Sequence, residues 1–385
     1  MNDRQIWMII PTYYPVIGGA QKQVEGIAQK LSRLGQTVRI LTRQHFRGHR
    51  AGLPVNEMVS DAHIRRIYSR GAGKLGSLLY LLGGWWYLFR HGRKGIYHAH
   101  DLGAAAWLAV LARLVLGGRC LIKMRTGRDR YEKSYASGPG RWVLAALLRL
   151  ADRVLVVNGE LEQMVQELGV AAEKAVRLPN TVDTRAYYPV RPNEKEAVRE
   201  RLLLPLGKTI VLYVGRLHPV KGLDILLRAW AQLPMNVRDR ALLVLVGDGP
   251  ERFALAELAE QLGITESVLL AGAQRAVRQY YWAADVFVLP SRTEGMSGAL
   301  IEAMACGLPC IASNVGGAPD LIQDGRNGAL LASEEPGQLA GKLFGMMGEP
   351  ERWAEMGKLA RKSALEYADM DIVVDRLRTI YGELK

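Results

Sequence analysis

The sequence predicts two doubly wound α/β domains, each built on a parallel sheet with helices on both faces. The chain has 385 residues, which is too long for one comfortable hydrophobic core. Apolar runs of strand length alternate with stretches of helical periodicity, a pattern typical of parallel sheets covered by helices. The alternation stops once, at a proline-rich segment, and then starts again.

The first half opens with Ile6-Trp7-Met8-Ile9-Ile10, a continuous apolar run of the kind found in strands buried on both faces. A helix is predicted after Gly18 and Gly19, because apolar residues then recur at helical spacing as far as Leu34. Gly35 follows as a typical helix stop. Further strands are predicted at residues 37–41, 64–67, 96–99, 120–124 and 154–157.

The second half follows a segment with several prolines between Pro179 and Pro205, which is the best candidate for a linker. The end of the chain has a helical pattern with a break near Asp369. Strands are predicted at residues 209–214, 242–246, 286–289 and 310–312. We therefore expect a first domain over residues 1–182, a linker over 183–206, a second domain over 207–367 and a terminal helix over 368–385.

Composition excludes several classes of protein. Hydrophobic residues make up 49% and charged residues 23%, so a disordered chain and a coiled-coil rod are excluded. The three cysteines, Cys120, Cys306 and Cys310, are too few to staple such a fold and suit a reducing compartment. The first residues lack the pattern of a secretory signal peptide, and we expect a cytoplasmic protein.

The formal net charge is +13, and the excess lies entirely in the first half. Residues 1–180 contain 27 basic and 12 acidic residues, a net charge of +15, whereas the remainder has a net charge of −2. A basic domain binds phosphates, nucleic acid or an anionic membrane surface, or is simply a solubilising surface. Charge alone leaves these alternatives open.

Two apolar stretches, residues 75–89 and 104–116, are shorter than the roughly 20 residues that a membrane span needs. We predict that both are buried helices, with a helix on a membrane surface as the alternative. The alternative concerns the first stretch, because aromatic residues beside a basic cluster are typical of a lipid headgroup interface. These residues are Trp85, Trp86, Tyr87 and Phe89, followed by Arg90, His91, Arg93 and Lys94.

The densest group of candidate site residues lies between Pro290 and Gly317. A predicted strand ends at Leu289, and a loop of small residues leads into a helix whose free N–H groups form an anion site. Glu294 before the helix and Glu302 inside it can point into one pocket and accept hydroxyl hydrogen bonds from a sugar or ribose. The alternative is that Glu302 has no role in a site and is a solvated residue on the surface of the helix.

A second group, residues 215–222, joins a predicted strand to an amphipathic helix. Arg216 and Lys221 suit a diphosphate, because arginine binds it as a planar fork and lysine as a point charge. Such cations stabilise the negative charge that develops on a leaving nucleoside diphosphate. Gly18 and Gly19 offer amides at another helix start, although the fingerprint of a dinucleotide site is absent.

Together these features resemble the retaining glycosyltransferases of family 4, which have the two-domain GT-B fold. The resemblance covers essentially the whole chain and is most specific in the block ending in EAMACGLP, with its Glu-x7-Glu motif at 294–302. It implies two Rossmann-like domains facing an interdomain cleft and a terminal helix that crosses back to the first domain. Looser motifs occur in the expected order: Gly18-Gly19, His98-Ala99-His100-Asp101, Pro179-Asn180-Thr181-Val182-Asp183, the GR…KG residues at 215–222, and Gly247-Asp248-Gly249-Pro250.

The resemblance implies transfer of a sugar, with retention of its anomeric configuration, from a UDP- or GDP-sugar to a hydroxyl of a glycan or lipid-linked acceptor. This reaction would belong to cell-surface polysaccharide or glycoconjugate biosynthesis. Three residues would be catalytic: Arg216 and Lys221 as a diphosphate clamp, and Glu294 facing the donor sugar. No metal or other cofactor is expected, because cations and amides replace it. The implied donor-binding residues are Glu302 at the ribose, Ala273 and Gln274 near the base, and Gly18, Gly19, Gly215, Gly295, Met296 and Ser297.

The acceptor side departs from the family pattern at one position. Many relatives end the fifth strand with a histidine that contacts the donor sugar, whereas this strand leads into Arg125. Arg125 and His100 are the acceptor-side candidates. The basic first domain is expected to meet an anionic membrane surface as a peripheral protein on the inner face, and no nucleic acid is expected. Residues 98–101 and 369–371 contain metal-ligand residue types but lack the context of a metal site.

Two other classes of function stay open at this stage, because a fold does not fix a function. One is an epimerase or phosphorylase on the same fold, although no lysine site for pyridoxal phosphate is evident. Product analysis separates transfer from epimerisation. The other is a non-catalytic phosphate or nucleic-acid binder, whose salt-sensitive binding would survive Glu294→Ala and Glu302→Ala.

Overall fold

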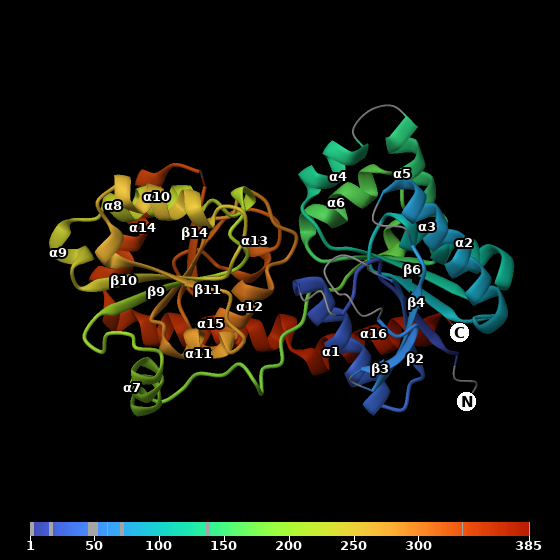
Figure 1. Cartoon of the computed structure of the whole chain (residues 1–385), viewed down its shortest axis with the longest axis horizontal. Helices are drawn as coiled ribbons and strands as arrows, with labels where there is room; N and C mark the ends of the chain where they lie inside the picture. The colour runs from blue at the N-terminus through green and yellow to red at the C-terminus, as the bar shows by residue number, and fades with distance from the viewer. Residues whose placement is uncertain are drawn as a thin grey trace. The chain divides into compact units, whose positions relative to one another are not determined.

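The protein forms two compact units, and each is a sheet with helices packed on both faces (Figure 1). Unit 1 contains Met1–Asn180 and Met370–Lys385, and unit 2 contains Thr181–Asp369. The predicted class, two doubly wound α/β units, is confirmed. The computed structural model describes residues 4–14, 18–44, 53–59, 61–69, 73–135, 139–332 and 334–384.

The sheet of unit 1 has the strand order β3-β4-β2-β1-β5-β6-β7-β8. All neighbours are parallel except β3 and β4. The strands predicted from apolar runs are present, whereas β3 and β8 were not predicted because both are short edge strands with partly exposed side chains. The strands are β1 (Ile6–Ile9), β2 (Val38–Arg43), β3 (Asn56–Val59), β4 (Ala62–Ile67), β5 (Ile96–Ala99), β6 (Arg119–Met124), β7 (Arg153–Val156) and β8 (Ala175–Arg177).

The helices of unit 1 lie on both faces of this sheet, with α1 and α16 packed together on one face and α2, α3 and α5 on the other (Figure 1). Gly35 lies just beyond the end of α1 with φ +82°, in the left-handed region expected of a helix stop. The helices are α1 (Gly19–Arg33), α2 (Lys74–His91), α3 (Ala104–Leu116), α4 (Arg128–Tyr135), α5 (Pro139–Arg149), α6 (Gly159–Glu167) and α16 (Met370–Glu383), with a 3₁₀ turn η1 (Ala172–Lys174).

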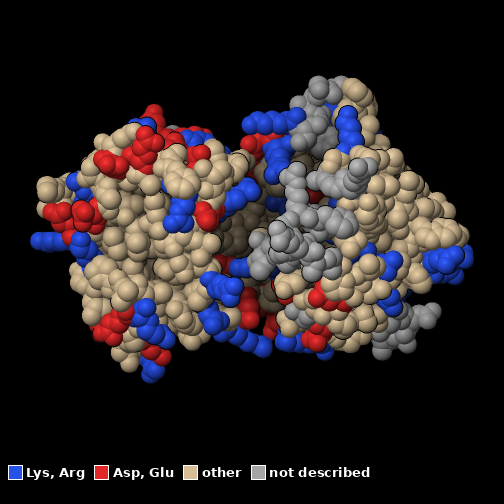
Figure 2. Space-filling view, in the orientation of Figure 1, with Lys and Arg blue, Asp and Glu red and all other residues tan. Residues whose placement is uncertain are grey.

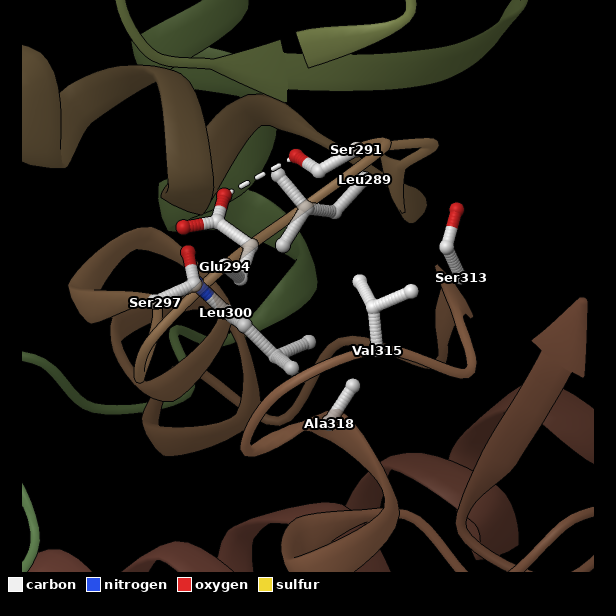
Figure 3. Close-up of a pocket in the computed structure, with 8 residues that line it drawn as sticks. All are labelled: Leu289, Ser291, Glu294, Ser297, Leu300, Ser313, Val315 and Ala318. Carbon is white, nitrogen blue, oxygen red and sulfur yellow. Dashed lines mark hydrogen bonds between the residues drawn. The ribbon is translucent and has the colours of Figure 1, made fainter. Parts of the chain in front are cut away.

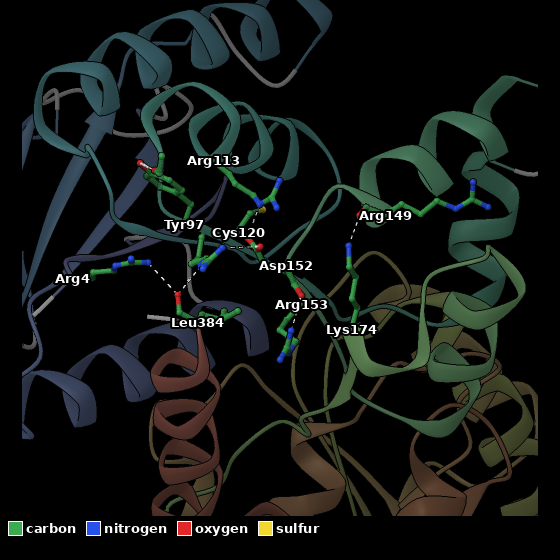
Figure 4. Close-up of polar contacts among 11 residues, drawn as sticks. Arg4, Tyr97, Arg113, Cys120, Arg149, Asp152, Arg153, Lys174 and Leu384 are labelled. Atoms are coloured by element: carbon green, nitrogen blue, oxygen red, sulfur yellow. Dashed lines mark hydrogen bonds and ion pairs between the residues drawn. The ribbon is translucent and has the colours of Figure 1, made fainter. Parts of the chain in front are cut away.

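The C-terminal helix α16 is part of the core of unit 1. The predicted break at Asp369 is confirmed, because one helix ends before this residue and α16 begins after it. Leu377 is fully buried against the β1–β2 side of the sheet. The carbonyl oxygen of Leu384 accepts hydrogen bonds from Arg4 Nη1 at 3.1 Å and Arg119 Nε at 2.7 Å (Figure 4). These contacts hold Leu384, just after α16, against β6 and against the residues that precede β1.

A buried carboxylate ties three elements of unit 1 together. Asp152, just before β7, accepts hydrogen bonds from the backbone N–H of Cys120 at 2.8 Å and from Arg113 Nε at 2.6 Å (Figure 4). Arg119 lies 3.6 Å away on the other carboxylate oxygen. Because a buried charge is costly without partners, these two cations stabilise the junction of α3, β6 and β7.

The prediction that residues 75–89 and 104–116 are buried helices is wrong for their outer faces. The inner faces do pack, since Gly84 of α2 lies against Leu108 of α3. On the outer faces, Leu82 is 58% exposed and Val115 is 59% exposed. Both stretches are apolar on all sides, so periodicity gave no sign of which side faces water. Among the described residues, none of the helices combines the length and hydropathy needed to cross a bilayer.

Unit 2 has a six-stranded, fully parallel sheet with the order β11-β10-β9-β12-β13-β14. The four predicted strands are present, and β11 and β14 were not predicted. The strands are β9 (Thr209–Val214), β10 (Ala241–Val246), β11 (Val268–Gly272), β12 (Val286–Leu289), β13 (Cys310–Ser313) and β14 (Gly328–Leu331). The helices are α7 (Pro192–Arg201), α8 (Leu223–Ala231), α9 (Met235–Arg238), α10 (Arg252–Gln261), α11 (Val277–Ala283), α12 (Gly298–Ala305), α13 (Ala318–Leu321), α14 (Pro336–Gly348) and α15 (Trp353–Ala368), with 3₁₀ turns η2 (Pro219–Lys221), η3 (Thr265–Ser267) and η4 (Pro350–Arg352).

The segment 183–206 carries helix α7, which packs on unit 2. Arg199 on this helix donates to Asp285 Oδ2 at 2.6 Å and to the carbonyl oxygen of Ala283 at 2.9 Å. Lys195 Nζ reaches the other oxygen of Asp285 at 2.5 Å. Charge-assisted hydrogen bonds of this kind are about twice as strong as neutral ones, so the helix is firmly attached to unit 2.

The packing of α16 gives a first prediction. Leu377→Ala removes a fully buried side chain and should lower the free energy of unfolding by about 2–5 kcal/mol. Arg376→Ala, on the exposed side of the same helix, should change it by no more than about 0.5 kcal/mol. Denaturant unfolding of the full chain measures both. Equal effects of the two substitutions would show that α16 is not part of the core.

Candidate functional site

The sheet of unit 2 reverses its strand order at β9. From β9 the chain adds β10 and β11 on one side, then returns and adds β12 on the other. Open α/β sheets bind ligands beyond the carboxyl ends of the strands at such a reversal. The two densest sequence motifs, residues 215–222 and 290–297, follow β9 and β12 directly. The topology therefore brings them to one place.

The loops after β9 and β12 fit together through close backbone contacts. Gly222 has φ +64°, and a Cβ atom there would lie 2.1 Å from the carbonyl oxygen of Pro290. Gly247, after β10, has φ +144°, and its Cβ would lie 1.8 Å from the carbonyl oxygen of Gly215. Any side chain would separate these backbones. The glycines of the GR…KG and GDGP motifs are thus required by packing.

Lys221 and Glu294 meet between these two loops. Lys221 Nζ forms an ion pair with Glu294 Oε1. Figure 3 shows the hydrogen bond that the same oxygen accepts from Ser291 Oγ at 2.9 Å. The side chains of Lys221 and Glu294 are 20% and 14% exposed. The sequence predicted the two charged residues separately, and the structure joins them. Ser291 was not singled out, although it lies in the same motif.

Glu294 lines a small pocket at the carboxyl ends of β12 and β13 (Figure 3). Ser297, also in this pocket, is the N-cap of α12 and accepts a hydrogen bond from the N–H of Leu300 at 3.3 Å. The carbonyl oxygen of Gly295 accepts from the N–H of Gly317 at 2.7 Å, which holds the loop between them. The other lining residues are Leu289, Ser291, Leu300, Ser313, Val315 and Ala318. The pocket therefore combines a carboxylate, three hydroxyls and the start of a helix.

Arg292 supports this arrangement and was not predicted. Its two terminal nitrogens each donate to an oxygen of Asp224 at 2.8 Å, and Nη1 also donates to the carbonyl oxygen of Pro219 at 2.6 Å. Its backbone N–H donates to the carbonyl oxygen of Val220 at 2.8 Å. The hydrogen bonds from Arg292 lower the pKa of Asp224. A bidentate arginine thus clamps the loop after β12 to the loop after β9.

Arg216 differs from Lys221 in its surroundings. It is exposed, and it forms no ion pair with any residue in the described part of the chain. Its backbone oxygen accepts a hydrogen bond from the buried hydroxyl of Tyr213 at 3.1 Å. Burial, and then Glu294, raise the pKa of this hydroxyl, so it stays a neutral donor. Arg216 is therefore anchored by its backbone while its guanidinium faces water.

Glu302 and the base-side residues lie apart from this pocket. Glu302 is one turn into α12 and does not line the pocket. Burial and the Glu302 carboxylate raise the pKa values of Tyr187 and Tyr281, which places the carboxylate beside these two hydroxyls. Ala273 and Gln274 are exposed after β11, where Gln274 Nε2 donates to the carbonyl oxygen of Ala271 at 2.6 Å.

Unit 1 holds a second group of basic side chains at the carboxyl ends of the neighbouring strands β5 and β6. The rings of His98 and His100 stack with centroids 4.0 Å apart, and His98 Nδ1 lies 2.7 Å from the hydroxyl of Tyr381. Burial lowers the pKa of His98 to about 3 and that of His100 well below its usual value. Both histidines are therefore neutral near pH 7.

The neighbouring strand β6 contributes Lys123 and Arg125 to this group. Burial, and then the charge of Arg125, lower the pKa of Lys123 to about 7. Lys123 was not predicted, although a lysine inside an apolar strand is a signal that sequence reasoning can use. Arg125 lies 3.9 Å from Asp101, and its backbone N–H donates to the hydroxyl of Tyr131 at 2.9 Å. The structure thus brings His100 and Arg125 together in unit 1.

Gly18 and Gly19 stand at the start of α1, the first helix after β1. Gly18 is the N-cap, and α1 has no acidic residue in its first turn, so the amides at this end are available to an anion. No cluster of three metal-ligand side chains occurs among residues whose placement the structure describes.

Comparison with known proteins identifies the family. Residues 194–363 match the group 1 glycosyl transferases, and residues 18–181 match a glycosyl transferase 4-like domain. The chain is 31% identical over 290 residues to a GDP-mannose-dependent alpha-(1-6)-phosphatidylinositol monomannoside mannosyltransferase of Mycolicibacterium smegmatis, covering 71% of this chain and 74% of that protein. The chain therefore belongs to family 4 of the glycosyltransferases.

Another relative is D-inositol 3-phosphate glycosyltransferase 2 of Catenulispora acidiphila, 35% identical over 228 residues, or 56% of this chain and 53% of that protein. The chain spans about half the length of this and three further inositol phosphate glycosyltransferases.

Solved structures share the fold. Anabaena HepE in complex with UDP has a TM-score of 0.81 at 20% identity, covering 99% of this chain and 100% of that one. Sucrose-phosphate synthase of Thermosynechococcus elongatus has a TM-score of 0.84 at 23% identity, with 99% of both chains covered. The GT-B fold class is thereby confirmed.

The Arg292–Asp224 clamp gives a prediction about pH. A carboxylate with a lowered pKa stabilises the folded state above its unfolded pKa of about 3.9 and loses that effect as the pH falls below it. Asp224→Asn should lower the free energy of unfolding at pH 7 by about 0.5–1 kcal/mol, because the pair is partly exposed to water. The difference from wild type should shrink as the pH is lowered from 5 to about 3.

Denaturant unfolding across this pH range measures the effect. Asp239→Asn is the matched control, because Asp239 is exposed in the same unit and forms no ion pair with the described residues. A penalty for Asp224→Asn that stayed constant between pH 7 and pH 3 would contradict the charged clamp.

Proposed function

We propose that the protein is a retaining glycosyltransferase that moves a sugar from a UDP- or GDP-sugar to a hydroxyl of a glycan or lipid-linked acceptor. The observation that carries the proposal is the Lys221–Glu294 pair at the strand reversal of unit 2. It joins a cation suited to a diphosphate with a carboxylate suited to sugar hydroxyls. The family to which the chain belongs supports the same reaction.

The donor diphosphate would bind beyond β9, between Arg216 and Lys221. The guanidinium of Arg216 is exposed and forms no ion pair with the described residues, so it can bind phosphate oxygens as a planar fork. Lys221 is held by Glu294 before the donor arrives. A preorganised cation costs little reorganisation during the reaction. The start of α12, with Gly295, Met296 and Ser297, would supply amides to the same anion.

In the proposed reaction, the bond between the anomeric carbon and the diphosphate oxygen breaks, and the acceptor oxygen bonds to the anomeric carbon on the same face. The acceptor proton passes to an oxygen of the leaving diphosphate. Negative charge builds up on that diphosphate in the transition state, where Arg216 and Lys221 stabilise it most. Glu294 would bind sugar hydroxyls and keep Lys221 in place. These groups would act without a metal.

The remaining donor roles follow the family pattern and are part of the proposal. Glu302 would bind the ribose. Burial and the Glu302 carboxylate raise the pKa values of the neighbouring Tyr187 and Tyr281, so both hydroxyls stay neutral beside it. Gly215, Ala273 and Gln274 would line the nucleotide, with the last two near the base. Gly18 and Gly19 would offer their amides at the start of α1.

An anionic, lipid-linked acceptor fits the basic character of unit 1, where Arg125 and His100 stand at the carboxyl edge of the sheet. A relative that carries phosphatidylinositol monomannoside in its name supports an acceptor of this kind. With this acceptor we associate a cytoplasmic location at the inner face of a membrane, in the synthesis of surface glycans. Product analysis by NMR tests transfer with retention against epimerisation of the donor.

The diphosphate clamp gives a prediction about turnover. Arg216→Ala and Lys221→Ala should each lower kcat about 100-fold or more, the size of effect expected for a lost transition-state charge partner. Arg228→Ala, an exposed arginine on α8 of the same unit, should leave kcat within about twofold of wild type. Steady-state assays with the preferred donor measure all three. Near-normal kcat in both clamp variants would remove the clamp from the mechanism.

Donor binding gives a prediction about thermal stability. A UDP- or GDP-sugar at about 100 times its dissociation constant should stabilise the protein by about 2.7 kcal/mol and raise Tm by several degrees. Lys221→Ala should lose most of this shift at the same donor concentration. The measurement is a thermal-shift panel of UDP-, GDP- and ADP-sugars. A panel in which every nucleotide sugar leaves Tm unchanged would contradict the proposed donor class.

A further inference from the structure

Three neighbouring helices of unit 1 turn apolar faces towards solvent. Helix α3 packs against α2 and against α5, and all three cover the same face of the sheet (Figure 1). Over this part of unit 1 the surface is mostly uncharged, with basic side chains at its edge (Figure 2). Soluble proteins rarely expose large contiguous apolar patches unless the patch binds something.

Helix α2 has a continuous outward stripe of large apolar residues. Leu75, Leu78, Leu82, Trp86 and Phe89 recur at intervals of three or four residues, and each is about half exposed. The rings of Trp86 and Phe89 stack with centroids 6.1 Å apart. Such spacing places all five on one side of the helix. In an ordinary amphipathic surface helix this side would be polar.

Helices α3 and α5 extend the same surface. On α3 the outward positions are Trp107, Leu111, Leu114 and Val115, again at helical spacing. On α5, Trp142 is 73% exposed, although burial of an aromatic ring is normally one of the largest gains in folding. We call the outward faces of α2, α3 and α5 the apolar surface of unit 1.

The surroundings of this surface are basic. Helices α2, α3 and α5 contain no acidic residue and five lysine or arginine residues, which are Lys74, Arg90, Arg113, Arg141 and Arg149. Lys74 begins α2, while Arg90, Arg93 and Lys94 are exposed at its end. The Arg90 guanidinium lies 4.7 Å from the centre of the Trp86 ring. Cations beside interfacial tryptophans match the phosphates above the hydrocarbon of an anionic bilayer.

We propose that the apolar surface of unit 1 inserts into the interface of an anionic lipid bilayer. The helices would lie flat, with their leucine and tryptophan side chains among the acyl chains and their basic neighbours at the phosphates. A second copy of the chain is a poorer occupant, because two such surfaces would bring like charges together. A helix on a membrane surface is the alternative that the sequence analysis left open for residues 75–89 and 104–116. The exposed side chains of α2 and α3 favour this alternative, and α5 extends the surface.

The position of the surface suits the proposed acceptor. In a parallel α/β unit each helix runs back against its strands, so the first turns of α3 and α5 lie at the carboxyl edge of the sheet. Trp107 and Trp142 are in these first turns, and Arg125 follows β6 at the same edge. Lipid docking would therefore hold this edge near headgroups. Docking itself does not rest on the transfer reaction, because it is measured without donor or acceptor.

The test is vesicle flotation of the full-length protein. One set of vesicles is phosphatidylcholine alone, and the other contains about one third phosphatidylglycerol to supply negative charge. The wild type should float with the anionic vesicles, and a substantial part should stay bound in about 0.5 M salt, because apolar contacts are not screened. Leu82→Glu with Leu114→Glu should lower the partition coefficient about tenfold or more, since a carboxylate is costly in hydrocarbon.

The matched control is Phe253→Glu with Met235→Glu, which adds the same charge at two residues of unit 2 that are 84% and 70% exposed. This variant should float like the wild type. Lys221→Ala should also float like the wild type while losing turnover, so that failure of docking and failure of the transfer reaction are distinguishable. Circular dichroism of all variants checks that they fold.

Three outcomes would overturn the proposal. Equal loss of flotation in both glutamate pairs would show that charge alone decides binding. Complete release of the wild type in high salt would exclude insertion of the apolar surface. Absence of flotation, together with a dimer in sedimentation that Leu82→Glu with Leu114→Glu separates, would assign the surface to a second copy of the chain.

Discussion

The ion pair between Lys221 and Glu294 joins the two loops that form the candidate site of unit 2. It exists only because β9 and β12 are neighbours in the sheet, although 71 residues separate the end of β9 from the start of β12 in the sequence. Glycines let the two loops approach, and Arg292 clamps them together through Asp224. Without that approach the cation and the carboxylate would be two unrelated surface charges, each of little chemical use.

Unit 1 has the same architecture, but the side chains at the carboxyl ends of its strands are mainly basic. At the carboxyl ends of β5 and β6 it buries the imidazoles of His98 and His100 and the amine of Lys123, all with lowered pKa values. Burial keeps the two rings uncharged near pH 7, so Arg125 is the permanent cation of the group. Helix α16 completes the core here through Tyr381 and Leu377. The residues of α16 are therefore part of unit 1, whereas α15, which ends just before them in the sequence, belongs to unit 2.

The outer faces of α2, α3 and α5 give unit 1 a surface that the sheet does not require. Their inner faces pack within unit 1, as the close approach of Gly84 in α2 to Leu108 in α3 illustrates. The leucines and tryptophans that face outward are 42–73% exposed, and an apolar patch of this kind lowers solubility in water. A lipid interface turns the same side chains into a favourable contact, and the basic residues around them act in the same direction.

Much of this protein was determined by its sequence alone. Buried parallel strands need continuous apolar runs, so β1, β9 and β12 could be located directly. The motifs together indicated the family, and the block ending in EAMACGLP was the most specific of them. Sequence could not find β3 and β8, because short edge strands carry mixed residues. It also could not pair Lys221 with Glu294, nor show that Glu302 lies beside Tyr187 and Tyr281. Only the tertiary structure decided which side of α2 and of α3 is exposed. A helix that is apolar all round has no periodicity to indicate its exposed face, and packing within unit 1 left Leu82 and Val115 in water.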